Sequence, residues 1–213
     1  MDMTWLGDRR DVVVIDGPDA AAYLQSQASQ DLRGMVNGDS RWTFFLQPTG
    51  RVEVLARVTK AGDETFRLDT DLGFGPVLEA RLNRFKIRVK ATVTAEADSA
   101  GSTDVDDDNR IAAGWPMMGA EIVPGENIPA ETGLADVAIS FTKGCYPGQE
   151  LVERMESRGS TAPRRLAVLD KRDGDEPGKE VSHDGAPIGV ITSVGSTQVL
   201  AYLKRGHDGA ARD

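Results

Sequence analysis

The chain has 213 residues, of which 39% are hydrophobic and 28% are charged, a composition typical of a globular protein with a buried core. Its formal net charge of −9 and its pI near 4.8 argue against general binding to nucleic acid, which relies on basic residues that neutralise phosphates. Because no apolar run approaches the roughly 20 residues that span a bilayer, and the first residues lack the layout of a signal peptide, we expect no membrane association.

Short apolar runs separated by glycine, proline and aspartate dominate the first part of the chain. The β-branched run DVVVID, bounded by Gly17 and Pro18, is typical of a buried strand that leads into a helix. Apolar spacing of three and four predicts helices, and alternation predicts half-buried strands. The predicted elements are, in chain order, a strand at 11–16, a helix at 18–26, strands at 41–47, 52–59 and 65–69, a helix at 77–85 and a strand at 86–94. Hairpin-linked strands with two helices indicate a mixed α+β domain.

A change in composition separates this part from the rest. Residues 95–109 are small, polar and acidic with one isolated valine, so we expect a linker that cannot bury enough apolar area to order itself. After residue 160, short β-rich runs alternate with turn residues, which predicts a small antiparallel β-barrel. We therefore divide the chain into an α+β domain at 1–160 and a β-barrel module with a frayed tail at 161–213.

The chain contains a single cysteine, Cys145, which excludes an intrachain disulfide and favours a reducing, cytoplasmic location. Cys145 lies just before a predicted helix at 149–156, where the helix dipole and the neighbouring Lys143 favour a thiolate. Gly144 and Gly148 leave space around the sulfur for a partner molecule. Local chemistry alone also fits a small buried cysteine in a tight turn, and both interpretations stay open.

Other reactive or metal-binding arrangements are weakly supported. The two histidines, His183 and His207, lie far from Cys145 in the sequence, and no Cys-x-x-Cys or closely spaced histidine pair is present. We therefore predict no resident metal site. One thiol cannot hold an iron–sulfur cluster alone, which leaves transient cluster contact or a cluster shared with a partner.

The string KGCYPGQE at 143–150 resembles the K-G-C-[aromatic]-x-G-Q-E signature of the YgfZ-type folate-binding family, whose relatives include the glycine-cleavage T-protein. RIAAGWP at 110–116, NIPAETGL at 127–134 and IDGPDAAAYLQSQASQDL at 15–32 also resemble segments of that family, so the resemblance covers nearly the whole chain. It implies a T-protein-like folate-binding fold whose middle lobe is reduced to the acidic linker at 95–109.

The resemblance implies a function that composition and spacing do not show. It implies a folate-binding accessory protein, without classical turnover, that supports the assembly or repair of iron–sulfur enzymes and, through them, tRNA modification. Its implied partners are folate and iron–sulfur client or assembly proteins. Cys145 would be the functional thiol and Lys143 would hold it as thiolate. The tetrahydrofolate contacts that we carry over are Gln27, Asp31, Arg51, Trp115, Tyr146, Gln149 and Glu150.

Two rival functions remain, a tetrahydrofolate-dependent aminomethyltransferase and a ligand-free partner-binding scaffold of the same fold. The first is weakened by Ala112, because the T-protein branch carries a glutamate there and a carboxylate accepts two parallel hydrogen bonds from a pterin. For folate binding we expect Cys145, Gln27 and Asp31 to line one cleft with the segment at 110–116. The pterin would lie toward Trp115, and its acidic tail near Arg51.

Overall fold

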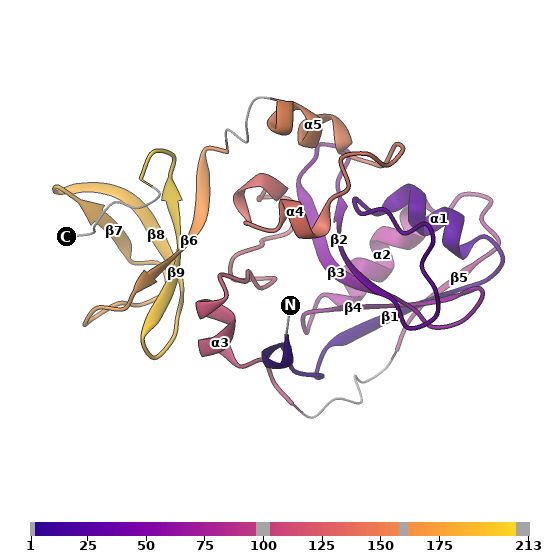
Figure 1. Ribbon diagram of the computed structural model, residues 1–213, viewed down its shortest axis with the longest axis horizontal. Helices are drawn as coiled ribbons and strands as arrows, with labels where there is room; N and C mark the ends of the chain where they lie inside the picture. The colour runs from indigo at the N-terminus through magenta and orange to yellow at the C-terminus, as the bar shows by residue number, and fades with distance from the viewer. Residues whose placement is uncertain (1–2, 97–102, 158–161, 208–213) are drawn as a thin grey trace.

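Two antiparallel sheets lie at opposite ends of an elongated molecule in the computed structural model, which describes residues 3–96, 103–157 and 162–207 (Figure 1). The first sheet has the strand order β2-β3-β4-β1-β5, and two helices pack on one of its faces. Its elements are β1 (Asp11–Asp16), α1 (Ala20–Gln27), β2 (Ser40–Leu46), β3 (Val52–Lys60), β4 (Thr65–Thr70), α2 (Gly75–Phe85) and β5 (Thr92–Ala95). This arrangement confirms the predicted α+β class.

The first sheet is buried on both faces, which explains the nearly continuous apolar runs in β2 and β3. One face packs against the two helices through side chains such as Leu24 and Leu82. The opposite face, which includes Phe44, packs against Trp115 and Ile122 from the middle of the chain. A strand covered on both sides has no solvent face, so its sequence does not alternate between apolar and polar residues.

The strand predicted at 86–94 is wrong over most of its length. Only Thr92–Ala95 joins the sheet, by antiparallel pairing with β1. Ile87 is 77% exposed and Arg88 has a φ of 56°, which an extended strand does not allow. The alternating residues Val89, Ala91 and Val93 do pack against the core, but α2 ends at Phe85 and the chain turns before it joins β1, so most of the segment is not a strand.

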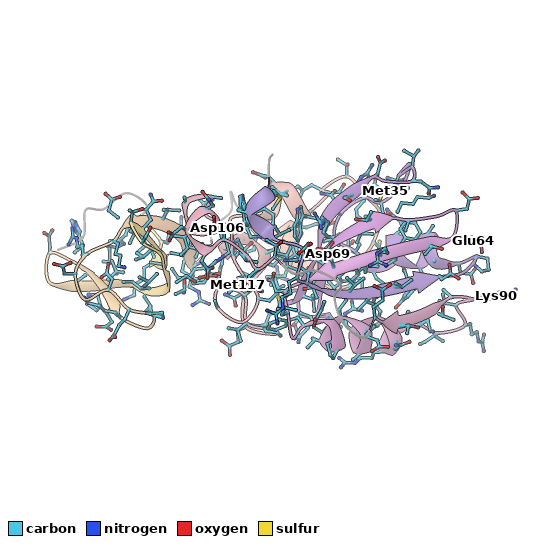
Figure 2. The ribbon with its side chains drawn as sticks, turned by 90° about the horizontal axis from the view of Figure 1, so that it is seen from below. Met35, Glu64, Asp69, Lys90, Asp106 and Met117 are labelled. Atoms are coloured by element: carbon cyan, nitrogen blue, oxygen red, sulfur yellow. The ribbon has the colours of Figure 1, made fainter. Side chains whose placement is uncertain are left out.

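The middle of the chain lies between the two sheets and consists of short helices and turns. Its elements are α3 (Asp107–Ala112), η2 (Pro129–Glu131), α4 (Ala135–Ala138) and α5 (Gln149–Ser157), and η1 (Thr4–Leu6) packs against α3. Seen from below, Asp106 and Met117 lie between the two sheets, and Asp69 marks the near end of the first one (Figure 2).

The predicted flexible linker is wrong for the part of 95–109 that the structure describes. The carbonyl of Thr103 accepts hydrogen bonds from the amides of Asp8 at 3.0 Å and Arg9 at 3.1 Å. Asp106 caps α3 by accepting from the amide of Asn109 at 3.1 Å. The acidic residues therefore serve the start of a helix, where carboxylates are favourable. Residues 97–102 lie outside the described part.

Four antiparallel strands form the terminal sheet, in the order β6-β9-β8-β7. They are β6 (Arg164–Asp170), β7 (Glu180–His183), β8 (Ala186–Val194) and β9 (Gln198–Lys204). The closed barrel that we expected is not confirmed, because the described residues show no pairing between the edge strands β6 and β7. The domain boundary near residue 160 stays a prediction. No helix among the described residues is long and apolar enough to cross a membrane.

A buried polar network connects the middle segment to the terminal sheet. The guanidinium of Arg110, which is 2% exposed, lies 3.1 Å from the carboxylate of Glu121 and donates to Ser193 Oγ at 3.0 Å. Ser193 in turn donates to Glu121 at 2.5 Å, and the hydroxyl of Tyr202 donates to the Glu121 carbonyl at 3.0 Å. Because Ser193 lies on β8 and Tyr202 on β9, this network fixes the terminal sheet against α3.

Candidate functional site

Cys145 lies in the loop that precedes α5, and its side chain is exposed. The prediction that the thiol is accessible to solvent is thereby confirmed, and the alternative of a buried structural cysteine is excluded. The residues on both sides of Cys145 are held by contacts with the end of α1 and with the turn between β2 and β3, so the thiol is presented by a loop whose ends are fixed.

On the N-terminal side, the loop is anchored by Lys143. Its ammonium Nζ donates to the carbonyls of Gln25 at 2.6 Å, Ala28 at 2.5 Å and Gln30 at 3.2 Å, at and just beyond the end of α1. A cation is favourable there because the carbonyls at a helix C-terminus carry partial negative charge. Burial lowers the pKa of Lys143 to about 8. The cation is thus committed to the end of α1, and the role that we assigned to it, stabilising the thiolate, has no contact in this structure to support it.

On the C-terminal side, the loop is fixed by Gly148, whose φ of +83° lies in the left-handed region. A Cβ added to Gly148 would lie 2.5 Å from the carbonyl oxygen of Gln47 and 2.9 Å from Cα of Gly50. The loop therefore packs backbone to backbone on the turn that joins β2 to β3. Gly144, next to the cysteine, differs, since a Cβ there would meet no atom within 4 Å.

Gln149 holds the loop from within. Its side-chain Oε1 accepts a hydrogen bond from the backbone amide of Tyr146 at 3.0 Å. The Tyr146 ring belongs to the core below the loop, and burial raises the pKa of its hydroxyl to about 12. Glu150 is exposed and pairs with Arg154, at 2.6 Å on the next turn of the helix. Gln149 Oε1 and the Tyr146 ring thus shape the loop.

Gln27 is also used internally. It is 8% exposed, and its Oε1 accepts from Arg81 at 3.0 Å. Arg81 is fully buried, donates to the Leu46 carbonyl at 2.9 Å and lies 3.2 Å from the carboxylate of Glu53. The β2–β3 pairing shifts register beside Leu46, which places Glu53 opposite no partner residue and allows it to meet Arg81 on α2.

Sequence reasoning missed Arg81 and Glu53. The signal that could have found them is a charge inside an apolar stretch, because VEVLA places a glutamate in a strand that is otherwise buried. A buried carboxylate requires a cation or several donors nearby. This pair supports the wall against which the cysteine loop packs.

The remaining predicted folate contacts are distributed over the molecule. Asp31 pairs with Arg33 at 2.6 Å, and this hydrogen bond holds the pKa of the carboxyl below its usual range. Arg51 is exposed and donates to the carbonyl of Glu126. Trp115 is 4% exposed and packs edge to face against Trp42, with 4.9 Å between ring centroids. The pterin-stacking face that we expected on Trp115 is therefore covered by the core.

The structure does bring the cysteine loop to the end of α1, as we predicted. Besides the Lys143 contacts, the amide of Ser140 donates to the Ser29 carbonyl at 3.0 Å, and Gln30 Nε2 donates to the Val137 carbonyl at 2.9 Å. These contacts are direct, so protein fills this part of the cleft that we expected between the two segments. The segment at 110–116 faces the terminal sheet through Arg110 instead. Within the described residues no group of three or more His, Cys, Asp or Glu side chains is arranged to hold a metal ion.

The exposure of Cys145 leads to a direct chemical prediction. In the native protein we expect iodoacetamide to alkylate the thiol without denaturant, at a rate within about tenfold of that in the unfolded chain. Because the chain has one cysteine, mass spectrometry of the intact protein reports this reaction alone. Protection of the thiol until the protein is unfolded would contradict the exposed loop.

Comparison with known proteins places these features in context. No family model matches the chain. It is 25% identical to the mitochondrial iron–sulfur cluster assembly factor IBA57 homologue of Neurospora crassa, over 86% of this chain and 56% of that protein. The mouse mitochondrial IBA57 is 27% identical over 96% of this chain and 75% of that protein. A shorter match, 43% identical over 32% of this chain and 20% of that protein, is to the tRNA-modifying protein YgfZ of Serratia proteamaculans.

The chain spans less than two thirds of the length of the Neurospora protein. Among solved structures, that of the glycine cleavage system aminomethyltransferase T from Bartonella henselae is similar with a TM-score of 0.78. The match covers 92% of this chain and 76% of that chain at 15% identity, which shows a shared fold.

Proposed function

This chain is a member of the family that contains the YgfZ and IBA57 proteins, and on this premise we propose that it is an accessory protein in the assembly or repair of iron–sulfur proteins. The observation that carries the proposal is the exposed thiol of Cys145, held between two fixed points of one loop. A core cysteine needs no such support, whereas a thiol that must meet a partner at a defined position does.

The number of thiols determines what Cys145 can do. A cluster bound through cysteine needs about four protein ligands, and this chain supplies one thiolate. We therefore propose that Cys145 contributes a single ligand, or handles a sulfur species, in transient contact with a client or assembly protein that supplies the others. Gly144, beside which no atom lies within 4 Å, leaves room for that partner.

Tetrahydrofolate is the ligand that we propose for this fold, supported by the similarity to aminomethyltransferase T. The residues that we carried over for it fit poorly, because Gln27, Asp31 and Arg51 are engaged within the protein and Trp115 is buried. Ala112 is exposed and supplies no carboxylate. We therefore propose that the chain binds tetrahydrofolate more weakly than relatives with a full middle lobe and carries out no one-carbon chemistry. The rival function, aminomethyl transfer, is then supported by the fold alone. A cytoplasmic location and a link to tRNA modification stay predictions.

Replacing Cys145 with serine tests the proposed role of the thiol. In a bacterial strain that lacks its own YgfZ-type protein, we expect wild-type chain to restore iron–sulfur enzyme activity and Cys145→Ser to lose it. The thermal midpoint should not change, because the side chain is exposed and, among the described residues, makes no hydrogen bond of the kind that Lys143 makes. Thr142→Ala, at an exposed position of the same loop, is the matched control and should restore activity.

Full restoration of activity by Cys145→Ser would overturn the role of the thiol. Folate binding is measured separately, by titrating the protein with tetrahydrofolate and following quenching of its tryptophan fluorescence. Loss of activity in Cys145→Ser together with no quenching at millimolar tetrahydrofolate would favour the scaffold function, in which the fold presents the thiol without a folate.

A further inference from the structure

The edge strand β6 differs from the other sheet edges because it is long, regular in register and, among the described residues, has no segment paired with its outer side. β7, at the other edge of the same sheet, has four residues and a register shift between Val181 and Ser182. In the first sheet, β5 also has four residues, and β2 is covered by the segment that bridges Ala28 to Phe45. β6 has seven residues in regular register and a half-buried apolar centre, LAVL. Long, regular edges of this kind accept further strands.

The register identifies which backbone groups of β6 face outward. The amide of Lys171 donates to the carbonyl of Thr197 at 2.9 Å, and that of Arg205 donates to Pro163 at 3.0 Å. Both are directly opposite pairs of the β6–β9 ladder, and in an antiparallel ladder hydrogen-bonded pairs alternate with non-bonded ones. The odd-numbered residues of β6 therefore bond to β9, and the amides and carbonyls of Leu166 and Val168 point to the open side. No backbone hydrogen bond joins these two residues to any other described segment.

A cleft of about 440 Å³ lies along this open side. Its walls are residues 165–169 of β6 and, opposite them, the segment around η2 and α4 that includes Ala130 and Gly133. In a packed sheet, residues are about 3.3 Å apart along a strand, strands about 4.8 Å apart, and layers about 10 Å apart. The product of these spacings, about 160 Å³, is the volume that one residue of an added strand occupies. The cleft therefore has the volume of about three residues in extended conformation. Its far wall belongs to the same chain, so the cleft suits a single strand better than the edge of a second folded sheet.

We infer that this cleft binds an extended, basic peptide segment of a partner protein, which adds to β6 as a further strand. The backbone of the segment would pair with the outward amides and carbonyls of Leu166 and Val168. The cleft is lined by the carboxylates of Asp136 and Glu156 and by the guanidinium of Arg165, so its lining is net negative and would favour lysine or arginine side chains on the part of the segment beside α4 and α5. The inference goes beyond the proposed function, because it uses neither Cys145 nor a folate.

Amide hydrogen exchange tests the inference with a simple probe, an acetylated heptapeptide amide of alternating lysine and valine. In the free protein we expect the amides of Leu166 and Val168 to exchange fast, and that of Ala167, bonded to β9, to exchange slowly. Saturating peptide should slow Leu166 and Val168 by at least about tenfold and leave Ala167 unchanged. The same peptide with every backbone amide N-methylated has no N–H to donate from either edge and should give no protection.

Two variants separate strand addition from other modes of binding. Val168→Pro removes an outward amide without removing a bond to β9, so we expect the sheet to fold and the peptide affinity to fall about tenfold. Val168→Thr keeps the amide and is the control. Asp136→Asn should weaken binding mainly at low salt, since it removes one carboxylate from the cleft.

Unchanged exchange at Leu166 and Val168 under saturating peptide would overturn the inference, and so would equal protection by the N-methylated peptide. Protection that instead grows with protein concentration in the absence of peptide would assign the edge to a second copy of this chain. If Val168→Pro lowers the thermal midpoint, the comparison of the two peptides on the wild-type protein still decides the question. Because neither Cys145 nor folate enters the experiment, its failure is distinguishable from failure of the proposed function.

Discussion

Replacing Arg110 with methionine is expected to lower the free energy of unfolding by about 3–5 kcal/mol. Methionine is a long, unbranched side chain that fills much of the space of arginine. The loss of stability would therefore come from the missing charge and not from a large cavity. Its partner Glu121 is fully buried, with 0% of the side chain exposed, and would lose the cation that lies 3.1 Å away. The carbonyl of Trp115, which accepts from the Arg110 guanidinium at 2.9 Å, would also lose its donor.

Chemical denaturation followed by tryptophan fluorescence measures this loss. The double variant Arg110→Met, Glu121→Gln should recover part of it, because no isolated charge then remains in the interior. Arg154→Met is the matched control, since it removes an ion pair whose two side chains are 51% and 86% exposed and should change stability by less than about 0.5 kcal/mol. A loss below about 1 kcal/mol for Arg110→Met would mean that the network does not hold the terminal sheet in place.

The second large effect is expected for Gly148→Ala, which should lower the free energy of unfolding by at least about 2 kcal/mol. An alanine would have to adopt a φ of +83°, and its methyl group would lie 2.5 Å from the Gln47 carbonyl oxygen. The methyl group has no rotamers and the neighbouring oxygen belongs to the main chain, so no side-chain movement can relieve the contact. The loop must then move away from the β2–β3 turn, taking Cys145 with it.

Gly144→Ala provides a control with the same chemical change in the same loop. It has no atom within 4 Å of the added methyl group, so we expect its stability to stay within about 0.5 kcal/mol of the wild type. The two glycines are equivalent in the sequence motif, and only the structure separates them. Equal effects of the two substitutions on the denaturation midpoint would contradict this assignment.

The core strands were predictable from the sequence because their signal is local. A β-branched run such as the one around Val13 needs burial, and the structure supplies it. Helix α5 follows in the same way from Leu151, Val152 and Met155 on one face. The strand at 86–94 failed because alternation describes a surface that is half-buried, and whether a partner strand reaches it depends on residues far away.

The candidate site was predictable in part. The exposure of Cys145 was one of the two interpretations that its local chemistry left open, and the approach of the cysteine loop to the end of α1 followed from family resemblance. The hydrogen-bond partners of the Lys143 ammonium could not be predicted, because they are backbone carbonyls, which every residue has and which carry no sequence signature. The burial of Trp115 against Trp42 could not be predicted either, since a tryptophan beside a proline occurs both in cores and in pocket walls.

The Lys143 anchor has a consequence for the order in which the chain matures. Its ammonium is separated by 118, 115 and 113 positions from its three acceptors, so forming this contact closes one of the longest loops in the protein. Long-range closures form late, after the local elements they join. During synthesis the first sheet and α1 emerge well before the cysteine loop. The thiol therefore acquires its fixed surroundings only on a chain whose first sheet and α1 are already folded, and an incompletely folded chain would carry the cysteine without the geometry that presents it.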